Sequence, residues 1–169
     1  MPLSMYQASV PVFRQMLTSL SAILDKAAAY AAEKKIDPSA LLQARLYPNM
    51  FALTRQVQTA SDHAKGATAR LAGIEVPKFA DEEKSFDDLK ARIAKTLDFI
   101  GSVPAAKFDG SEERAVSLKV GPNEMSFKGQ AYLLGYALPN FFFHVTTAYD
   151  ILRHNGVAIG KGDFIGRAG

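Results

Sequence analysis

Apolar residues recur every three or four positions between residues 50 and 71, and this spacing constrains the fold more than any other feature of the chain. Steps of three and four residues alternate through Met50, Leu53, Val57, Ala60, Ala64, Ala67 and Leu71. Such steps place every member on one face of an α-helix. Asn49 stands where an N-cap is expected, and Gly73 stands where helices commonly stop. The pattern predicts an amphipathic helix that needs partners for its apolar face.

Three further segments repeat this pattern. One begins near Phe13, another opens at Ser85 and ends at Gly101, and the last spans about residues 129–155. Pro139 is expected to bend or split the last helix, because a proline inside a helix removes a backbone hydrogen bond and clashes with the preceding turn. Four apolar stripes joined by loops predict an all-α protein, an up-and-down four-helix bundle.

The pattern changes between residues 114 and 128. Apolar and polar residues alternate there on both sides of the turn sequence Gly121-Pro122-Asn123. Alternation around such a turn is typical of a β-hairpin. We therefore expect a small hairpin between the third and fourth long helices, lying against the bundle because an isolated two-stranded ribbon is only marginally stable.

Composition narrows the class of protein. A length of 169 residues predicts a single domain over residues 1–169. With 48% hydrophobic and 22% charged residues, the chain is neither disordered nor fibrous. The chain has no cysteine, which excludes disulfides, thiolate nucleophiles, zinc–thiolate sites and iron–sulfur clusters.

Charge and hydropathy bear on partners and location. The formal charge is 20 − 17 = +3, and the basic residues are spread along the chain. Nucleic-acid binding needs a concentrated basic patch, so no nucleic-acid partner is expected. The amino terminus lacks the charged start of a signal peptide, and no apolar run approaches the roughly 20 residues that span a bilayer. We expect a cytoplasmic protein without a membrane partner.

Four polar residues fall at the edges of two apolar stripes. Gln56 and His63 lie seven residues apart on the second long helix, and Asn140 and His144 lie four residues apart on the last. Residues at these spacings share one side of a helix. We expect a polar cluster wherever these two helices pack together, whereas His154, in the final turn of the last helix, is expected at the surface.

Two interpretations of this cluster stay open at this stage. Its members are either hydrogen-bonded structural residues or the lining of a metal or small-molecule pocket. A metal would be held incompletely, because amide oxygens bind zinc or nickel more poorly than imidazole does.

The aromatic residues of the last helix bear on assembly. Phe143 and Tyr136 point away from the stripe that contains Phe141, because residues at these positions lie on different sides of a helix. Either the hairpin covers them or they form a contact between subunits, and the second alternative predicts a homodimer.

Several motifs resemble a known family. The run Leu138-Pro139-Asn140-Phe141-Phe142-Phe143-His144-Val145-Thr146-Thr147-Ala148-Tyr149, its continuation Leu152-Arg153-His154-Asn155-Gly156 and the segment Ala69-Arg70-Leu71-Ala72-Gly73 are similar to a bacterial domain-of-unknown-function family. That family is grouped with the DinB/YfiT-like superfamily of metalloenzymes. The similarity covers essentially the whole chain, and it implies a four-helix bundle.

The resemblance also implies a site and a chemistry. Superfamily members commonly hold a divalent metal such as zinc or nickel with one histidine of the second helix and a His-x-x-x-His pair of the last. The matching positions here are Gln56, Asn140 and His144, with His63 as a substitute two turns after Gln56. Characterised relatives include metal-dependent thiol transferases, an isomerase and hydrolases.

Two functions are therefore weighed. The first is a DinB-like bundle with a degenerate metal or small-molecule pocket that acts as a transferase or hydrolase on a small substrate. The alternative is a non-catalytic dimeric bundle that binds a ligand or a partner. The residues that would perform catalysis are not predicted.

Overall fold

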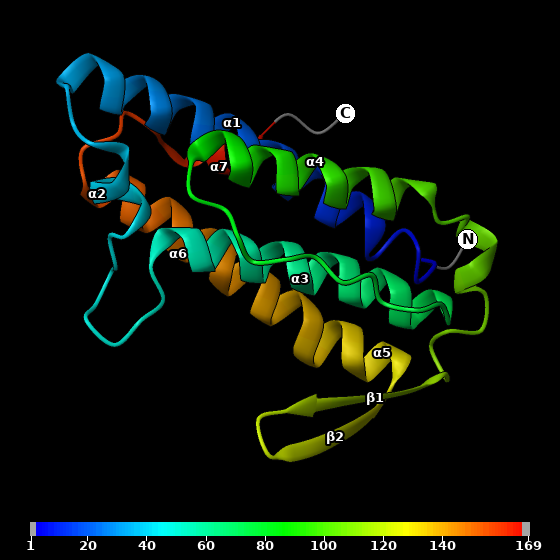
Figure 1. Cartoon of the computed structure of the whole chain (residues 1–169). Helices are drawn as coiled ribbons and strands as arrows, with labels where there is room; N and C mark the ends of the chain where they lie inside the picture. Colours follow the sequence, from blue (N-terminus) through cyan, green and yellow to red (C-terminus); the bar gives the residue numbers. More distant parts are fainter. Residues whose placement is uncertain (1–2, 167–169) are drawn as a thin grey trace.

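The computed structural model describes residues 3–166, which are mostly helical with one small hairpin (Figure 1). The elements follow one another as α1 Val10–Lys34, α2 Pro38–Leu42, α3 Leu53–Ala72, α4 Phe86–Ser102, a 3-10 turn Ala105–Phe108, β1 Ala115–Val120, β2 Asn123–Lys128, α5 Gly129–Tyr132, a π-helical turn η2 Leu133–Ala137, α6 Leu138–His154 and α7 Lys161–Ile165. The helical class and the position of the hairpin confirm the prediction in outline.

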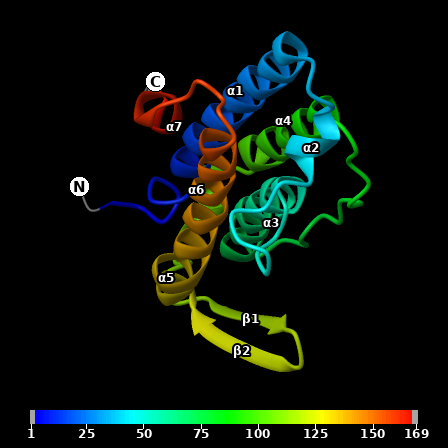
Figure 2. The ribbon, with the colours of Figure 1, turned by 90° about the vertical axis from the view of Figure 1, so that its left-hand side faces the viewer.

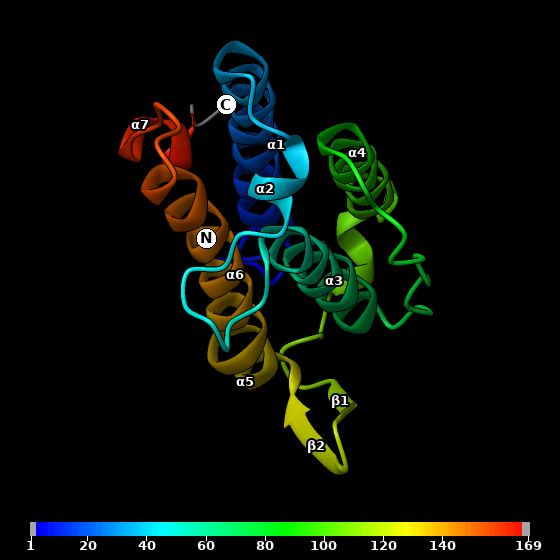
Figure 3. The same ribbon diagram turned by 60° about the vertical axis from the view of Figure 1, so that its left-hand side comes forward.

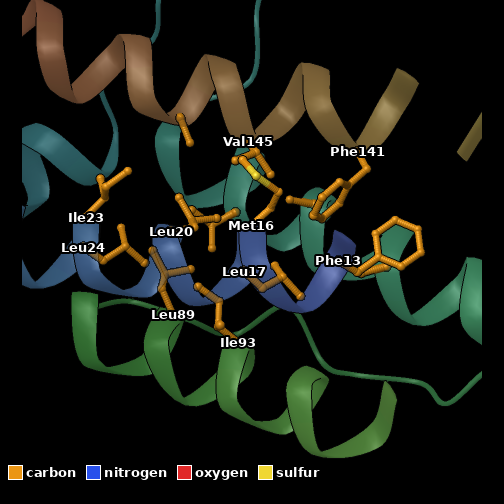
Figure 4. Packing of buried hydrophobic residues seen from close by; sticks show 14 of the residues in the cluster. Phe13, Met16, Leu17, Leu20, Ile23, Leu24, Leu89, Ile93, Phe141 and Val145 are labelled. Carbon is orange, nitrogen blue, oxygen red and sulfur yellow. The ribbon is translucent and has the colours of Figure 1, made fainter. Parts of the chain in front are cut away.

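The core lies around α1, whose apolar face is covered from two sides. Figure 4 shows side chains of α1 between Leu89 and Ile93 of α4 and Phe141 and Val145 of α6. Phe13 of α1 meets Phe141 edge to face, with ring centroids 4.9 Å apart. Because aliphatic and aromatic side chains lose contact with water here, burial of this stripe is the main contribution to folding.

The ends of the long helices follow from local signals. Ser85 and Asp88 form the reciprocal capping box of α4. Gly73 ends α3 in the left-handed conformation, with φ of 66°. The predicted N-cap Asn49 is wrong, because α3 begins only at Leu53 and residues 45–52 form a loop in which Arg45 donates a hydrogen bond of 2.6 Å to the carbonyl of Met50.

The order of helix directions differs from an up-and-down bundle. Lys90 near the start of α4 pairs with Asp25 toward the end of α1, and Gly101 at the end of α4 lies against Arg14 near the start of α1. α4 is therefore antiparallel to α1. α3 also starts at the end where α1 finishes, so α3 and α4 run in the same direction, and residues 73–85 return along α3 to connect them (Figure 1).

Polar contacts hold this long return connection in place, and sequence periodicity does not reveal them. Arg92 of α4 is 4% exposed and donates hydrogen bonds to the Ala80 carbonyl and to Glu83, at 3.0 and 2.9 Å. Arg92 also pairs with Asp62 of α3 at 2.8 Å. One buried arginine thereby ties α3, α4 and the connection together.

The last helical region is continuous but locally widened, so Pro139 does not split it. The π-helical turn η2 lies directly before α6, and Pro139 occupies the first turn of α6. The missing N–H and the ring of a proline disturb the turn before it, and a wider turn accommodates that disturbance. The helical region therefore continues past the proline with a bulge before it, and Tyr136 lies within that bulge.

The hairpin and the carboxyl-terminal helix lie at different sides of the bundle. β1 and β2 are antiparallel, with Val116 opposite Phe127, and the hairpin extends beyond α5 (Figure 3). Figure 2 shows α7 beside α1 and α6, on the opposite side from α4, and Lys26 of α1 contacts Asp163 of α7 at 2.6 Å. No helix described in the structure is long and apolar enough to cross a membrane.

Candidate functional site

A file of polar and aromatic side chains follows the contact between α3 and the α5–α6 region. α3 contributes Gln56, His63 and Arg70, each seven residues after the one before. Seven residues are almost two helical turns, so the three share one side of α3. Opposite them lie His144, Tyr136 and Tyr132. We call these six residues the α3–α6 file.

Gln56 fixes the orientation of His144. The Gln56 side chain is 1% exposed, and its Nε2 donates a hydrogen bond of 3.1 Å to the Phe51 carbonyl. The amide oxygen Oε1 then faces His144 Nδ1 at 2.7 Å, so Nδ1 must carry the proton and donate it. His144 is thereby held as the tautomer whose Nε2 is an unprotonated acceptor.

His63 lies between His144 and Tyr136. The rings of His63 and His144 are stacked, with centroids 5.6 Å apart and planes 15° apart. The Tyr136 ring lies 5.9 Å from His63, and the Phe51 ring lies 6.3 Å from His144. Phe127 of the hairpin packs on Tyr136 at 5.6 Å. The hairpin therefore covers Tyr136, one of the alternatives predicted for that residue.

Burial and neighbouring cations keep both imidazoles neutral at neutral pH. Burial lowers the pKa of His63 to about 4, and the neighbouring His144 and Arg70 act in the same direction, whereas Asp62 opposes them. Burial also lowers the pKa of His144 below its usual value, and the positive charge of Arg55 adds to this effect. A neutral imidazole at Nε2 is able to accept a proton from a bound molecule.

Arg70 occupies the other end of the file. Its Nη1 donates a hydrogen bond of 3.2 Å to the Tyr132 hydroxyl, and its guanidinium lies 6.0 Å from the centre of the Tyr132 ring. Tyr132 is 1% exposed, and its ring stacks on Tyr136 at 5.9 Å. Aromatic contacts therefore connect Arg70 to His63.

Asn140 is engaged elsewhere. Its Nδ2 donates a hydrogen bond of 2.8 Å to the carbonyl of Tyr136, one turn earlier on the same helical region. Of the four residues predicted to form a polar cluster, the structure brings Gln56, His63 and His144 together. The amide group of Asn140 instead forms a hydrogen bond with the helix backbone at the π-helical turn.

The family resemblance implies a divalent metal here, and the chemistry of the donor set tests that implication. Gln56 Oε1 accepts the hydrogen bond of His144 Nδ1, and Asn140 Nδ2 donates to the Tyr136 carbonyl, so both amides are engaged in hydrogen bonds. Two imidazoles remain, whereas a catalytic metal centre usually has three protein ligands. Metal binding by Gln56, His63, Asn140 and His144 stays a prediction. Within residues 3–166, no three His, Cys, Asp or Glu side chains are grouped to hold a metal ion.

The sequence reasoning missed part of the file. Arg70 continues the seven-residue spacing of Gln56 and His63, so the spacing itself contained the signal. Tyr132 lies directly before the π-helical turn and Tyr136 lies within it, and a regular helical wheel misplaces residues relative to His144 across such a turn. Phe51 has no periodic signal, because it belongs to the loop before α3.

The fold and the file define a class: a mostly helical protein with a small hairpin and a histidine–glutamine pair between two of its long helices. The model of the family described as Domain of unknown function (DUF1993) matches residues 5–165, and the chain belongs to that family. The chain is also similar to a solved DinB family member protein from Shewanella denitrificans, with 40% identity and a TM-score of 0.87 over 96% of this chain and 92% of that one. The comparison with curated proteins found no match.

Proposed function

We propose that the protein is a DinB-like enzyme that acts on a small substrate beside His144, with hydrolase or transferase chemistry. The observation that carries the proposal is the 2.7 Å hydrogen bond from His144 Nδ1 to Gln56 Oε1. It leaves Nε2 as the proton acceptor, which is the arrangement that a histidine general base requires. Gln56 is neutral, so it orients the ring without raising its basicity as a carboxylate would.

The proton transfer follows from this arrangement. Nε2 of His144 takes a proton from water or from a substrate thiol or hydroxyl as the oxygen or sulfur attacks an acyl carbon. The imidazolium then returns that proton to the leaving group. Nδ1–H stays bonded to Gln56 throughout, so the ring keeps its position.

Hydrolysis of p-nitrophenyl acetate tests the proposal. Replacing His144 with Asn should lower kcat/KM by about tenfold or more, because general base catalysis contributes roughly 10²–10⁴-fold. His154→Asn is the matched control, because His154 lies exposed on the same helix. Equal rates for the wild type and His144→Asn would overturn the proposal.

Metal content separates this mechanism from a metalloenzyme. Protein purified without a histidine tag should contain substoichiometric zinc, nickel, iron and manganese, and dialysis against a chelator should leave the rate unchanged. A stoichiometric metal lost together with activity would instead support the ligand set Gln56, His63, Asn140 and His144.

A second candidate function is the non-catalytic dimeric binding protein, which Phe143 favours. The Phe143 side chain is 55% exposed on α6, and Leu134, on the π-helical turn before α6, is 54% exposed. Exposed apolar residues of this size are common at subunit contacts. Sedimentation of the wild type and of Phe143→Lys distinguishes the cases: a dimer that the substitution dissociates supports this contact, and a wild-type monomer contradicts it.

A further inference from the structure

The chain between α3 and α4 crosses the surface of both helices without joining the core. We call residues 75–84 of this connection the strap. None of its residues is buried, and Val76, Phe79 and Ala80 neither belong to the hydrophobic core nor pack directly against it. No backbone–backbone hydrogen bond joins residues 75–83 to another part of the described chain, residues 3–166. Apolar burial and backbone pairing, which usually hold a segment in place, therefore contribute little here.

Polar and charged side chains of the helices hold the strap instead. Arg92 of α4 contacts Asp81 and Glu83, each at 2.9 Å. Arg55 of α3 pairs with Asp81 at 2.5 Å, and Gln58 of α3 donates a hydrogen bond of 2.7 Å to Glu83. Both helices thus grip the strap at the same two carboxylates, so these contacts form and break together.

The aromatic ring of the strap is also held by cations. The amino groups of Lys65 and Lys95 lie 4.6 and 4.2 Å from the centre of the Phe79 ring. The guanidinium of Arg92 lies 5.7 Å from the same point. A cation over an aromatic ring is attracted to it electrostatically. Phe79 therefore rests on charged groups, and its attachment depends on charge as that of the carboxylates does.

The helix side of this contact has a second partner for its cations. The side chains of Arg92 and Lys65 are 2% and 7% exposed, and both also pair with Asp62 of α3. Departure of the strap would therefore leave each of them a carboxylate. On the strap side, the Asp81 side chain is 42% exposed, so dissolved ions reach its pairs and screen them.

We propose that the strap is a charge-held cover that detaches from α3 and α4 as a unit while the helices stay folded. Segments with few buried apolar contacts open at a lower free energy than the core does. Detachment opens the pocket of about 420 Å³ that lies between Phe79 and Ala80 of the strap and Lys95 of α4, and it exposes the guanidinium of Arg92. The strap is thereby a device through which ionic strength changes the surface that the protein presents.

Trypsin cleavage of the native protein after Lys78 tests the strap, because cleavage tracks the open fraction when reclosing is fast. Lys119 is the internal reference, since backbone pairing of β1 with β2 holds it in place. Raising NaCl from about 20 mM to about 500 mM should increase cleavage after Lys78 relative to Lys119 by roughly three- to tenfold, because salt weakens exposed ion pairs. Urea should accelerate this cleavage less steeply than it unfolds the whole protein, since detachment exposes little surface.

Glu83→Gln is the test variant, and Glu82→Gln is its matched control, because each removes one negative charge from the strap. Glu82 is exposed and forms no ion pair within the part of the chain that the structure describes, whereas Glu83 contacts Arg92. Glu83→Gln should raise cleavage after Lys78 roughly tenfold at low salt and reduce its salt dependence. Glu82→Gln should behave like the wild type.

Three results would overturn the charge-held strap. The first is a ratio of Lys78 to Lys119 cleavage that NaCl leaves unchanged, and the second is equal cleavage in Glu83→Gln and Glu82→Gln. The third is a urea dependence of Lys78 cleavage as steep as that of global unfolding, because the strap would then leave only when the helices unfold. The salt and urea series use the wild type, so they decide the question even if Glu83→Gln weakens the whole fold.

Discussion

Gln56 Oε1 lies 2.7 Å from His144 Nδ1, and the second bond of the same amide, to the Phe51 carbonyl, determines which atom of Gln56 faces the imidazole. A carbonyl only accepts hydrogen bonds, so the amide nitrogen must point to Phe51 and the amide oxygen to His144. The loop of residues 45–52 therefore sets the tautomer of a histidine 88 residues after Gln56 in the chain.

Gln56→Glu should raise the pKa of His144. A carboxylate in place of the amide favours the charged imidazolium, whereas burial and Arg55 now lower this pKa. An increase of about one to two pH units is expected, measured from the imidazole signals during an NMR titration. Gln56→Leu is the control, since it removes the acceptor without adding charge. A His144 pKa that is equal in the two variants would contradict this hydrogen-bond assignment.

Helix periodicity predicts the long helices because their burial repeats every 3.6 residues. The stripe from Leu53 to Leu71 is buried along α3 as expected. The periodicity of apolar residues does not indicate in which direction each helix runs relative to its neighbours. The return of residues 73–85 along α3 depends on Arg92 and its contacts with Glu83 and Ala80, which have no periodic pattern.

The candidate site was predictable as far as regular helices extend. Gln56 and His63 share one side of α3, and His144 meets both. Asn140 lies next to the π-helical turn, where its amide group bonds to a backbone carbonyl. A helical wheel drawn with a constant number of residues per turn does not predict that contact. Side-chain pairing of this kind is decided by local backbone geometry more than by spacing.

His63 should make the protein less stable as the pH falls. Its native pKa of about 4 lies below the ordinary value of 6.5, so the unfolded chain binds a proton that the native state excludes. The free energy of unfolding therefore decreases with falling pH below 6.5, and the His63 contribution between pH 6.5 and pH 5 is about 1.5 kcal/mol. Urea unfolding of His63→Gln should show a flatter pH dependence by this amount, and the exposed His154→Gln should match the wild type.

Gly129→Ala should destabilise the junction between the hairpin and α5. A Cβ at this position would stand 1.8 Å from the Ser111 carbonyl oxygen, so the backbone must move. Overpacking of this kind costs about 1–3 kcal/mol, and thermal unfolding should show it. Gly135→Ala is the matched control, because nothing lies within 4 Å of the Cβ it would add. Similar melting temperatures for the two variants would contradict the close approach.

Arg92→Met should cause the largest loss of stability. The side chain is 4% exposed and pairs with Asp62, Asp81 and Glu83. An apolar replacement leaves Glu83 without its cation, and it leaves Asp62 and Asp81 with only Lys65 and Arg55. Removal of one partner from a buried ion pair costs about 3–5 kcal/mol. Urea unfolding measures this loss. Lys95→Met is the control: Lys95 also lies over the Phe79 ring, at 4.2 Å, but it is exposed, so about 0.5–1 kcal/mol is expected. If both variants lost the same small amount, Arg92 would not be what holds the connection of residues 73–85 against α3 and α4.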